Sequence, residues 1–224
     1  MTPSDSILRD NAAVWEQMLG HRFVRDVCAD RLPEAVFHRY LRYEGAFVET
    51  AIGIFAYATA RAPDVAAKRW LIGVQQALAN DQLRYFEKTF AALGIAPLAQ
   101  LPEQAADFDG GMLEIAERGS FAEIVTAMFA AEWLYATWCR RAAGGGIADP
   151  HLRRWVELHA EEAFTRQAEW LKAAVDASAE TADAADLSRI FGRVIALEIA
   201  FHSAAYDPAE EAGPQAGGPG EGGR

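Results

Sequence analysis

Apolar residues recur along this chain three or four positions apart, which is helical spacing, and no stretch alternates apolar and polar residues as a strand would. Capping residues such as Asp64, Ser120 and Asp149 precede the apolar runs, and Gly94 and Gly119 follow two of them. The pattern therefore predicts an all-α fold of seven or eight helices. We expect them over about residues 5–19, 23–28, 33–62, 64–93, 102–119, 120–143, 149–177 and 182–206.

The length and composition indicate one sizeable domain with a tail. The chain has 224 residues, of which 51% are hydrophobic, and it contains no internal repeat or long linker. Residues 1–207 are therefore expected to form a single helical domain. The remaining residues, 208–224, hold six of the eighteen glycines and no large apolar side chain. Such a segment has nothing to bury, so we predict a disordered tail.

The charge and the cysteine content narrow the function classes. A net charge of -11 repels phosphate backbones, so nucleic-acid binding is not expected. The chain shows neither a signal peptide nor an uncharged apolar run of about eighteen residues, so we expect a cytoplasmic protein without a membrane span. Cys28 and Cys139 are too few for a disulfide framework or a metal quartet. Neither has a Lys or His close by, so both are interpreted as packing residues.

Two glutamates interrupt apolar helix faces. Glu44 falls between Tyr40 and Val48 on the inward face of its helix, where an unpaired charge is costly. It is either a buried glutamate paired with an arginine or a backbone amide, or a carboxylate that faces a cavity. Glu198 interrupts the final helix in the same way, with His202 one turn further on. That pair could be half of a metal site or a simple helical pair.

Two further polar residues lie beside apolar stripes. Glu132 sits about 100° around the helix from Ala131, so it could line a pocket or pair at a helix interface. His159 lies at the apolar edge of the helix that carries Trp155, where a histidine is more often a satisfied core residue than a ligand. The spacing alone leaves both alternatives open.

Five segments of the chain, in this order, resemble the TenA/thiaminase II family. They are WEQMLGHRFVRDVCADRLPEAVFHRYLRYEGAFV, YFEKTFAALGIAP, GSFAEIVTAMFAAEWLY, WVELHAEEAFTRQ and RVIALEIAFHSAAYD. Together they span nearly all of residues 15–207. The resemblance implies a haem-oxygenase-like helical bundle that assembles as a homo-oligomer, a tetramer or a dimer. It also implies a buried pocket that hydrolyses an aminopyrimidine or a thiamine-like molecule without a metal or another cofactor.

The resemblance also assigns the lining of that pocket. Phe47 and Phe108 stand where the family carries tyrosines, and His159 takes the place of another tyrosine. Tyr135 and Phe201 match the family pattern. These five residues are therefore expected to contact the substrate, with the aromatic rings stacked on its flat ring.

The catalytic machinery departs from the family pattern. Ala131 falls where the nucleophilic cysteine is expected, and alanine cannot form the covalent intermediate. Glu44 stands at the position of a family aspartate, and Glu198 matches the distal glutamate. With Glu132, they are the expected catalytic residues of a cysteine-free branch. Alternatives on the same fold are a catalytically silent small-molecule-binding protein and an oxidative relative, either PqqC-like or with two metal ions.

Overall fold

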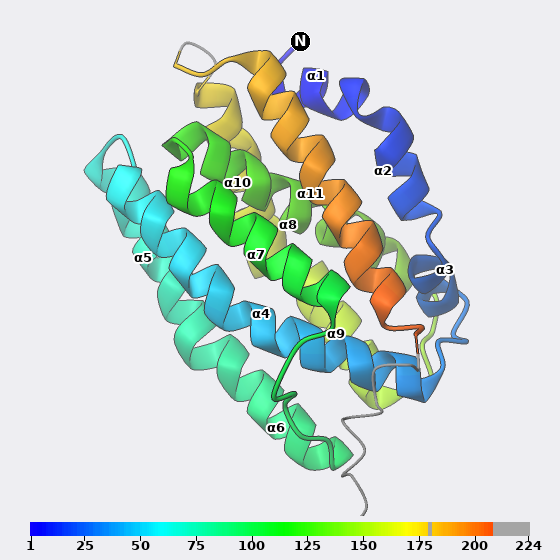
Figure 1. Ribbon diagram of the computed structural model, residues 1–224. Helices are drawn as coiled ribbons and strands as arrows, with labels where there is room; N and C mark the ends of the chain where they lie inside the picture. The colour runs from blue at the N-terminus through cyan, green and yellow to red at the C-terminus, as the bar shows by residue number, and fades with distance from the viewer. Residues whose placement is uncertain (179–180, 208–224) are drawn as a thin grey trace, which may run out of the picture.

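A computed structural model describes residues 1–178 and 181–207 of the chain (Figure 1). Over these ranges the chain contains α-helices, one π-helical turn and no strand, which confirms the predicted all-α class. The elements in chain order are α1 (Pro3–Asp10), α2 (Ala12–Leu19), α3 (Arg22–Cys28), α4 (Glu34–Arg61), α5 (Val65–Ala77), the π-turn η1 (Leu78–Gln82), α6 (Leu83–Leu93), α7 (Glu103–Arg118), α8 (Phe121–Ala143), α9 (Pro150–Ala160), α10 (Glu162–Ala177) and α11 (Ala184–Ala204).

Helix α8 forms the centre of the bundle. Most of its side chains are buried, and it packs against α9, α10 and α11 as well as α4 and α7. Several buried positions are alanines, among them Ala127, Ala130 and Ala131. Short side chains let neighbouring helices approach closely, because the distance between two helix axes depends on the side chains at the contact. The alanine-rich sequence of α8 therefore suits a helix that is surrounded by others.

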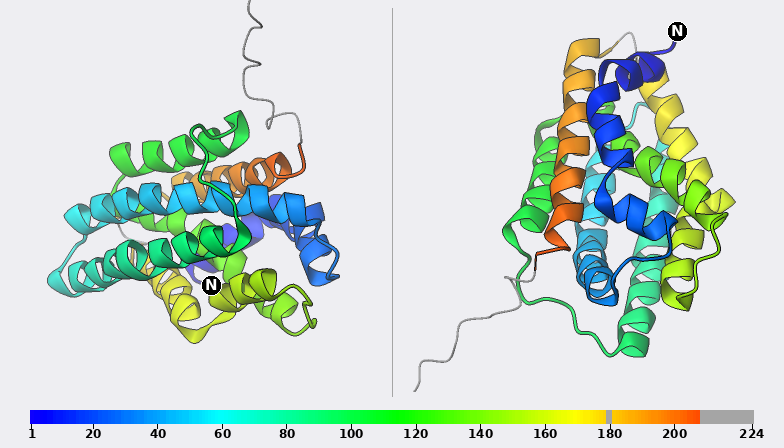
Figure 2. Two further views of the ribbon diagram at one scale, coloured as in Figure 1. Left: turned by 90° about the horizontal axis from the view of Figure 1, so that it is seen from below. Right: turned by 90° about the vertical axis from the view of Figure 1, so that its right-hand side faces the viewer.

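The remaining helices form layers around α8. Helices α4, α7 and α11 lie side by side, with α5 on the other side of α4 (Figure 1). The N-terminal helices α1 and α2 run along α11, as the right-hand view of Figure 2 shows. One apolar core runs between these layers and contains large buried rings such as Trp138, Trp155 and Tyr40. This arrangement surrounds the middle of α8 with side chains from both ends of the chain.

The predicted helix ends that rest on local signals are confirmed. Ser120 and Glu123 form a capping box, with distances of 3.3 Å and 2.7 Å between each side-chain oxygen and the other residue's amide nitrogen. The side chains of Asp64 and Asp149 each accept a hydrogen bond from the amide three residues later, at 2.8 Å and 2.7 Å. Gly94 ends α6 in the left-handed conformation with φ of 65°.

The predicted number of helices is too low, and the first reason is a break at Asn11. The sequence predicts one helix over about residues 5–19, whereas the structure has α1 and α2. The Asn11 side-chain amide donates to the Ile7 carbonyl at 2.9 Å. It also lies 3.0 Å from the Ser188 carbonyl and 2.9 Å from the Ser188 hydroxyl on α11. Asparagine competes with the helix for hydrogen bonds, and here the competing partners belong to a distant part of the chain. With two further breaks, the described residues form eleven α-helices rather than seven or eight.

Those two breaks divide the predicted helices 149–177 and 64–93. Glu161 is extended, with ψ of 154°, and separates α9 from α10. The turn η1, Leu78–Gln82, separates α5 from α6 with wider π-helical hydrogen bonding. Neither position carries a proline or a glycine, the residues that usually signal a break in a sequence. Both breaks lie next to the cavity described below.

Two further expectations concern membrane spans and the C-terminal tail. No helix within the described ranges is long and apolar enough to cross a membrane. The predicted tail, 208–224, lies outside the described residues, so the domain boundary at residue 207 stays a prediction.

Candidate active site

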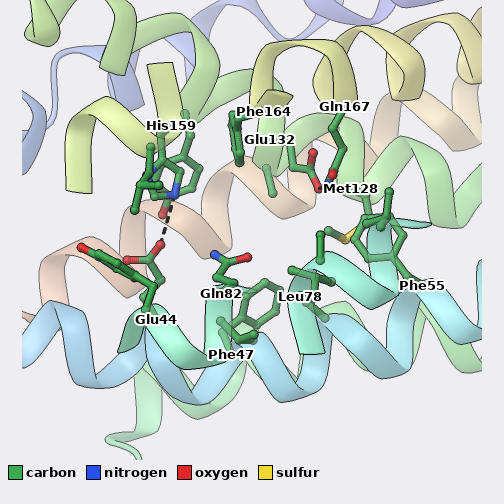
Figure 3. A pocket seen from close by; sticks show the side chains of 18 of the residues that line it. Glu44, Phe47, Phe55, Leu78, Gln82, Met128, Glu132, His159, Phe164 and Gln167 are labelled. Carbon is green, nitrogen blue, oxygen red and sulfur yellow. Dashed lines mark hydrogen bonds and ion pairs between the residues drawn. The ribbon is translucent and has the colours of Figure 1, made fainter. Parts of the chain in front are cut away.

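A cavity of about 420 Å³ opens beside the middle of α8 (Figure 3). All eight residues that the sequence singles out for catalysis or substrate contact line it. They are Glu44, Phe47, Phe108, Glu132, Tyr135, His159, Glu198 and Phe201. They come from five helices, and the structure brings them to one site. Their roles stay predictions.

The two unexpected breaks shape the wall of this cavity. The π-turn η1 contributes Leu78 and Gln82, and the Gln82 side chain points into the cavity (Figure 3). The break at Glu161 lets the end of α9 and the start of α10 face the cavity at different angles, so that His159 and Phe164 both line it. Single π-turns inside helices are frequent at functional sites. The irregular backbone at these two breaks therefore places side chains in the cavity wall.

Glu44 has two side-chain partners on α9. The Trp155 indole Nε1–H donates to Glu44 Oε2 at 2.5 Å, and His159 Nε2 lies 3.2 Å from Glu44 Oε1. All three residues are buried. The alternative that Glu44 pairs with an arginine or a backbone amide is therefore wrong, and its carboxyl group is held by an indole and an imidazole at the cavity wall.

Glu198 belongs to a polar network under the cavity. The Tyr135 hydroxyl donates to Glu198 Oε2 at 3.2 Å, and the Tyr40 hydroxyl lies 2.6 Å from that of Tyr135. His202 Nδ1 donates to the Glu198 carbonyl at 2.7 Å, while its Nε2 lies 3.4 Å from the Tyr135 hydroxyl. The other carboxyl oxygen, Glu198 Oε1, is buried and has no protein partner.

His202 and Glu198 therefore form a helical pair within this network. Among the residues that the structure describes, no three His, Cys, Asp or Glu side chains lie close enough together to hold a metal ion. Burial lowers the pKa of His202 to about 3, so this imidazole is neutral at physiological pH.

Glu132 faces the cavity and also makes a contact between helices. Its Oε1 accepts a hydrogen bond from Gln167 Nε2 on α10 at 2.7 Å, and its Oε2 is buried without a protein partner. Both of the interpretations that the sequence left open are thus combined in one side chain. Figure 3 shows this pair at the opposite end of the cavity from Glu44 and His159.

Burial sets the protonation of these glutamates. It raises the pKa of Glu132 to about 8, and the bond from Gln167 offsets part of the rise. It raises the pKa of Glu198 to about 8 as well, with the Tyr135 bond opposing the rise and the Glu44 charge adding to it. At neutral pH both groups are therefore mostly uncharged acids that can donate a hydrogen bond into the cavity.

Aromatic rings form much of the remaining wall. The ring centroids of Phe47 and Phe108 lie 4.7 Å apart, and those of Phe108 and Phe201 lie 4.8 Å apart. A flat ligand can stack against such a surface while its polar edges reach the carboxyl groups.

The cysteines do not take part in the site. Neither Cys28 nor Cys139 lines the cavity, whereas Ala131 does. Cys139 is fully buried, and burial raises the pKa of its thiol well above the usual range, which suppresses the reactive thiolate. The interpretation of Cys139 as a packing residue agrees with this placement.

The sequence pattern did not predict several residues at or beside the cavity. Trp155 is not among the site residues that the sequence predicts, because nothing in the periodicity reveals that its indole N–H donates to Glu44. Gln167 could have been found, because it lies one turn beyond Phe164 on the same face of its helix. Gln82 could not, since its orientation depends on the π-turn.

Comparisons with known proteins identify relatives of this chain. The chain is 24% identical over 216 residues to the aminopyrimidine aminohydrolase of Halalkalibacterium halodurans, covering 92% of this chain and 96% of that protein. A TenA homologue from Pyrococcus furiosus superposes with a TM-score of 0.84 at 21% identity, over 91% of this chain and 100% of that chain. A domain of unknown function from Shewanella denitrificans with a heme oxygenase-like fold superposes with a TM-score of 0.70 at 11% identity, over 90% and 91% of the two chains.

The structural matches confirm the predicted haem-oxygenase-like fold. The model of the TENA/THI-4/PQQC family matches residues 9–208, which is most of the chain. The protein therefore belongs to the TENA/THI-4/PQQC family.

Proposed function

We propose that this protein is a TenA-like hydrolase, an aminopyrimidine aminohydrolase related to thiaminase II, which acts in thiamine salvage without a cysteine nucleophile. One observation carries the proposal. Three buried glutamates surround an aromatic cavity in which Ala131 lines the wall. The name of the Halalkalibacterium halodurans relative supports an aminopyrimidine as the substrate.

The cavity suits a single flat ring with polar edges. Its volume of about 420 Å³ is in the range of small-molecule sites. We expect the pyrimidine ring to stack on Phe47, Phe108 and Phe201, with Tyr135 and His159 at its edges. The two carboxyl oxygens without protein partners, Glu132 Oε2 and Glu198 Oε1, are then available to the ligand. Buried polar atoms normally have a partner, and a ligand can supply it.

The three glutamates can divide the work of hydrolysis. Deamination requires a proton on the leaving nitrogen and a water molecule positioned for attack on carbon. Glu198, an uncharged acid at neutral pH, would hold and protonate the pyrimidine ring. Glu44 would orient the amine or the water, and Glu132 would hold the water through its unpartnered oxygen.

A thermal-shift screen followed by an ammonia-release assay tests this proposal. The screen uses thiamine, aminopyrimidines, their formyl derivatives and divalent metal ions, because a ligand that binds the folded state raises the melting temperature. We expect aminopyrimidines to raise it and at least one of them to release ammonia catalytically. A rise with metal ions alone would contradict the proposal.

Ala131 favours a second candidate, a protein that binds an aminopyrimidine without turning it over. The alanine removes the side chain that would act as nucleophile, while the apolar and carboxyl lining of the site is retained. Binding in the screen together with no ammonia release from any hit would favour this candidate over the hydrolase.

We also propose that the protein is a homo-oligomer, a tetramer or a dimer. On α5, Val65 and Ile72 are exposed, and the Trp70 ring stacks on that of Trp170 at the surface with 5.7 Å between centroids. We infer that these exposed apolar groups belong to an association surface. Sedimentation at several protein concentrations tests this expectation, and a monomer throughout would contradict it.

A further inference from the structure

The imidazole of His159 is held at both nitrogens. Its Nδ1 lies 2.8 Å from the main-chain carbonyl of Trp155, and its Nε2 lies 3.2 Å from Glu44 Oε1. A carbonyl oxygen only accepts hydrogen bonds, so Nδ1 must carry a proton. The ring cannot easily turn, because it packs against Trp155, Tyr135 and Phe164 with centroid distances of 4.6, 5.3 and 4.9 Å.

The contact between His159 and Glu44 then requires one more proton. With Nδ1 protonated, a neutral ring would present the Nε2 lone pair to the Glu44 carboxylate, and two lone pairs would face each other at 3.2 Å. One proton between them removes this repulsion, either on the imidazole as an ion pair or on the carboxyl group as a neutral pair. Both forms have the same total number of protons, so the proton can move between the two groups without a change in net charge.

Trp155 fixes the geometry of both partners. Its indole N–H donates to Glu44 Oε2 at 2.5 Å, and its carbonyl accepts from His159 Nδ1 at 2.8 Å. Trp155 thus holds Glu44 Oε2 and His159 Nδ1, the two atoms that face away from the contact between Glu44 Oε1 and His159 Nε2. The carboxyl oxygen and the ring nitrogen at that contact, Glu44 Oε1 and His159 Nε2, belong to residues that line the cavity.

The other ionisable groups near this contact are mostly uncharged at neutral pH. Burial raises the pKa of Glu198 to about 8 and those of the three nearby tyrosines and Cys139 above their usual ranges. These groups are Tyr40 on α4, Tyr85 on α6, Tyr135 and Cys139 on α8, and Glu198 on α11. Two exposed acidic residues also line the cavity, Asp81 and Glu161, and Glu161 is paired with Arg154 at 2.6 Å. We therefore place the exchangeable proton of the site at the contact between Glu44 and His159.

We propose that Glu44 and His159 act as one acid, whose single shared proton goes to the leaving nitrogen of the substrate, and that Trp155 positions the pair. This inference rests on the proposed function and assigns His159 a catalytic rather than only a binding role. As the carbon–nitrogen bond breaks, its electron pair stays on nitrogen, which takes the proton from the pair. A lone pair of water forms the new carbon–oxygen bond, and a proton of that water returns to the pair. The net reaction converts one amine and one water molecule into one alcohol and one ammonia molecule.

Kinetics of single and double variants test the catalytic role. We expect His159→Gln and Glu44→Gln each to lower kcat for ammonia release by roughly a hundredfold or more, with KM changed only a few-fold. Because the two residues share one proton, the double variant should be no slower than the slower single variant, and the loss should not multiply. His151→Gln, on the same helix but outside the cavity, is the matched control and should keep the parent rate. If the kcat losses of the two single variants multiply in the double variant, or if His159→Gln keeps the parent kcat, the proposal is overturned.

The positioning role of Trp155 has its own readout. Trp155→Phe keeps the carbonyl that binds Nδ1 but removes the indole donor to Glu44. We expect it to lower kcat and to change the pH dependence of kcat, whereas a merely structural role would lower only the amount of folded enzyme. An unchanged pH profile would overturn this part of the proposal.

A spectroscopic measurement tests the shared proton without any turnover. In protein labelled with ¹⁵N-histidine, we expect His159 Nδ1 to be protonated near neutral pH and the Nε2 signal to change in Glu44→Gln, with little change in His151→Gln. A His159 ring with unprotonated Nδ1, or a ring indifferent to Glu44→Gln, would overturn the pair. If the parent protein releases no ammonia from any aminopyrimidine, the proposed function fails and the catalytic use of the pair fails with it. The NMR result would then still decide whether the proton is shared.

Discussion

The hydroxyl groups of Tyr40 and Tyr135 lie 2.6 Å apart in the buried region beneath the cavity. Tyr135 gives its proton to Glu198 Oε2 at 3.2 Å, so the proton between the two phenols must come from Tyr40. The chain of donors runs from Tyr40 through Tyr135 to the carboxyl group of Glu198. Burial keeps the pKa of both phenols well above the usual range, so both stay protonated.

This direction predicts unequal effects for two matched substitutions. Tyr135→Phe leaves Glu198 without a side-chain donor and Tyr40 without an acceptor, so we expect a loss of about 1–3 kcal/mol in the free energy of unfolding. Tyr40→Phe removes only a donor to Tyr135 and should cost less. Chemical denaturation of the two variants measures the difference. Equal losses would contradict this direction, and a larger loss for Tyr40→Phe would indicate that the chain of donors runs the other way.

The raised pKa values of Glu132 and Glu198 predict how stability depends on pH. In the unfolded chain each carboxyl group ionises near pH 4.5, but burial in the folded protein raises its pKa to about 8. Between these values the folded state binds more protons than the unfolded state, so stability falls as the pH rises. Below about pH 4.5 the penalty is absent, and above about pH 8 it is complete.

Glu132→Gln tests this dependence because glutamine keeps the shape and cannot ionise. We expect the variant to gain stability over the parent as the pH rises from about 4.5 to 8, by at most about 1.4 kcal/mol for each unit of pKa shift removed. The two proteins should be nearly equal in stability at the acidic end. Denaturant titrations at several pH values give the measurement. Glu123, on the same helix, is not a suitable control position because its side chain caps α8. A constant difference across this range would mean that Glu132 ionises normally in the folded state.

The burial of Cys139 and the position of Cys28 predict that neither thiol is needed for turnover. Replacing both with alanine should leave ammonia release within a few-fold of the parent, because neither side chain lines the cavity. Alanine is preferred over serine at position 139, where a hydroxyl group would be buried in an apolar core. A loss of roughly a hundredfold in a folded double variant would indicate a cysteine nucleophile.

The fold could be predicted wherever the decisive signal is local. The caps at Asp64, Ser120 and Asp149 act through the next three residues, and Gly94 acts through its own backbone. The break at Asn11 could not be predicted, because its partner Ser188 is 177 residues away in the sequence. Tertiary contacts of this kind override the periodicity of a single segment.

The same distinction applies to the site. Glu44 and Glu198 were found because each interrupts an apolar face, and a buried carboxyl group is costly wherever the helix packs. Glu132 stayed ambiguous, since 100° from a stripe can mean a cavity or an interface, and only the position of Gln167 on α10 decides that it is both. Trp155 was missed because its apolar ring fits the core pattern, whereas its function lies in one N–H group.

Because Glu44 is held by Trp155 and His159, we expect Glu44→Gln to lower the catalytic rate without destabilising the fold. In Glu44→Gln the amide oxygen can accept from the Trp155 indole, and the amide NH₂ can donate to a neutral His159 ring. Histidine can release its extra proton, so no buried cation is left behind, unlike in an ion pair with arginine, where the loss would be about 3–5 kcal/mol. We therefore expect ammonia release to fall by roughly a hundredfold or more while the free energy of unfolding changes by less than about 1 kcal/mol. Glu49→Gln, at an exposed position of the same helix, should change neither quantity. An unfolded or strongly destabilised Glu44→Gln variant would assign Glu44 to the stability of the bundle rather than to catalysis.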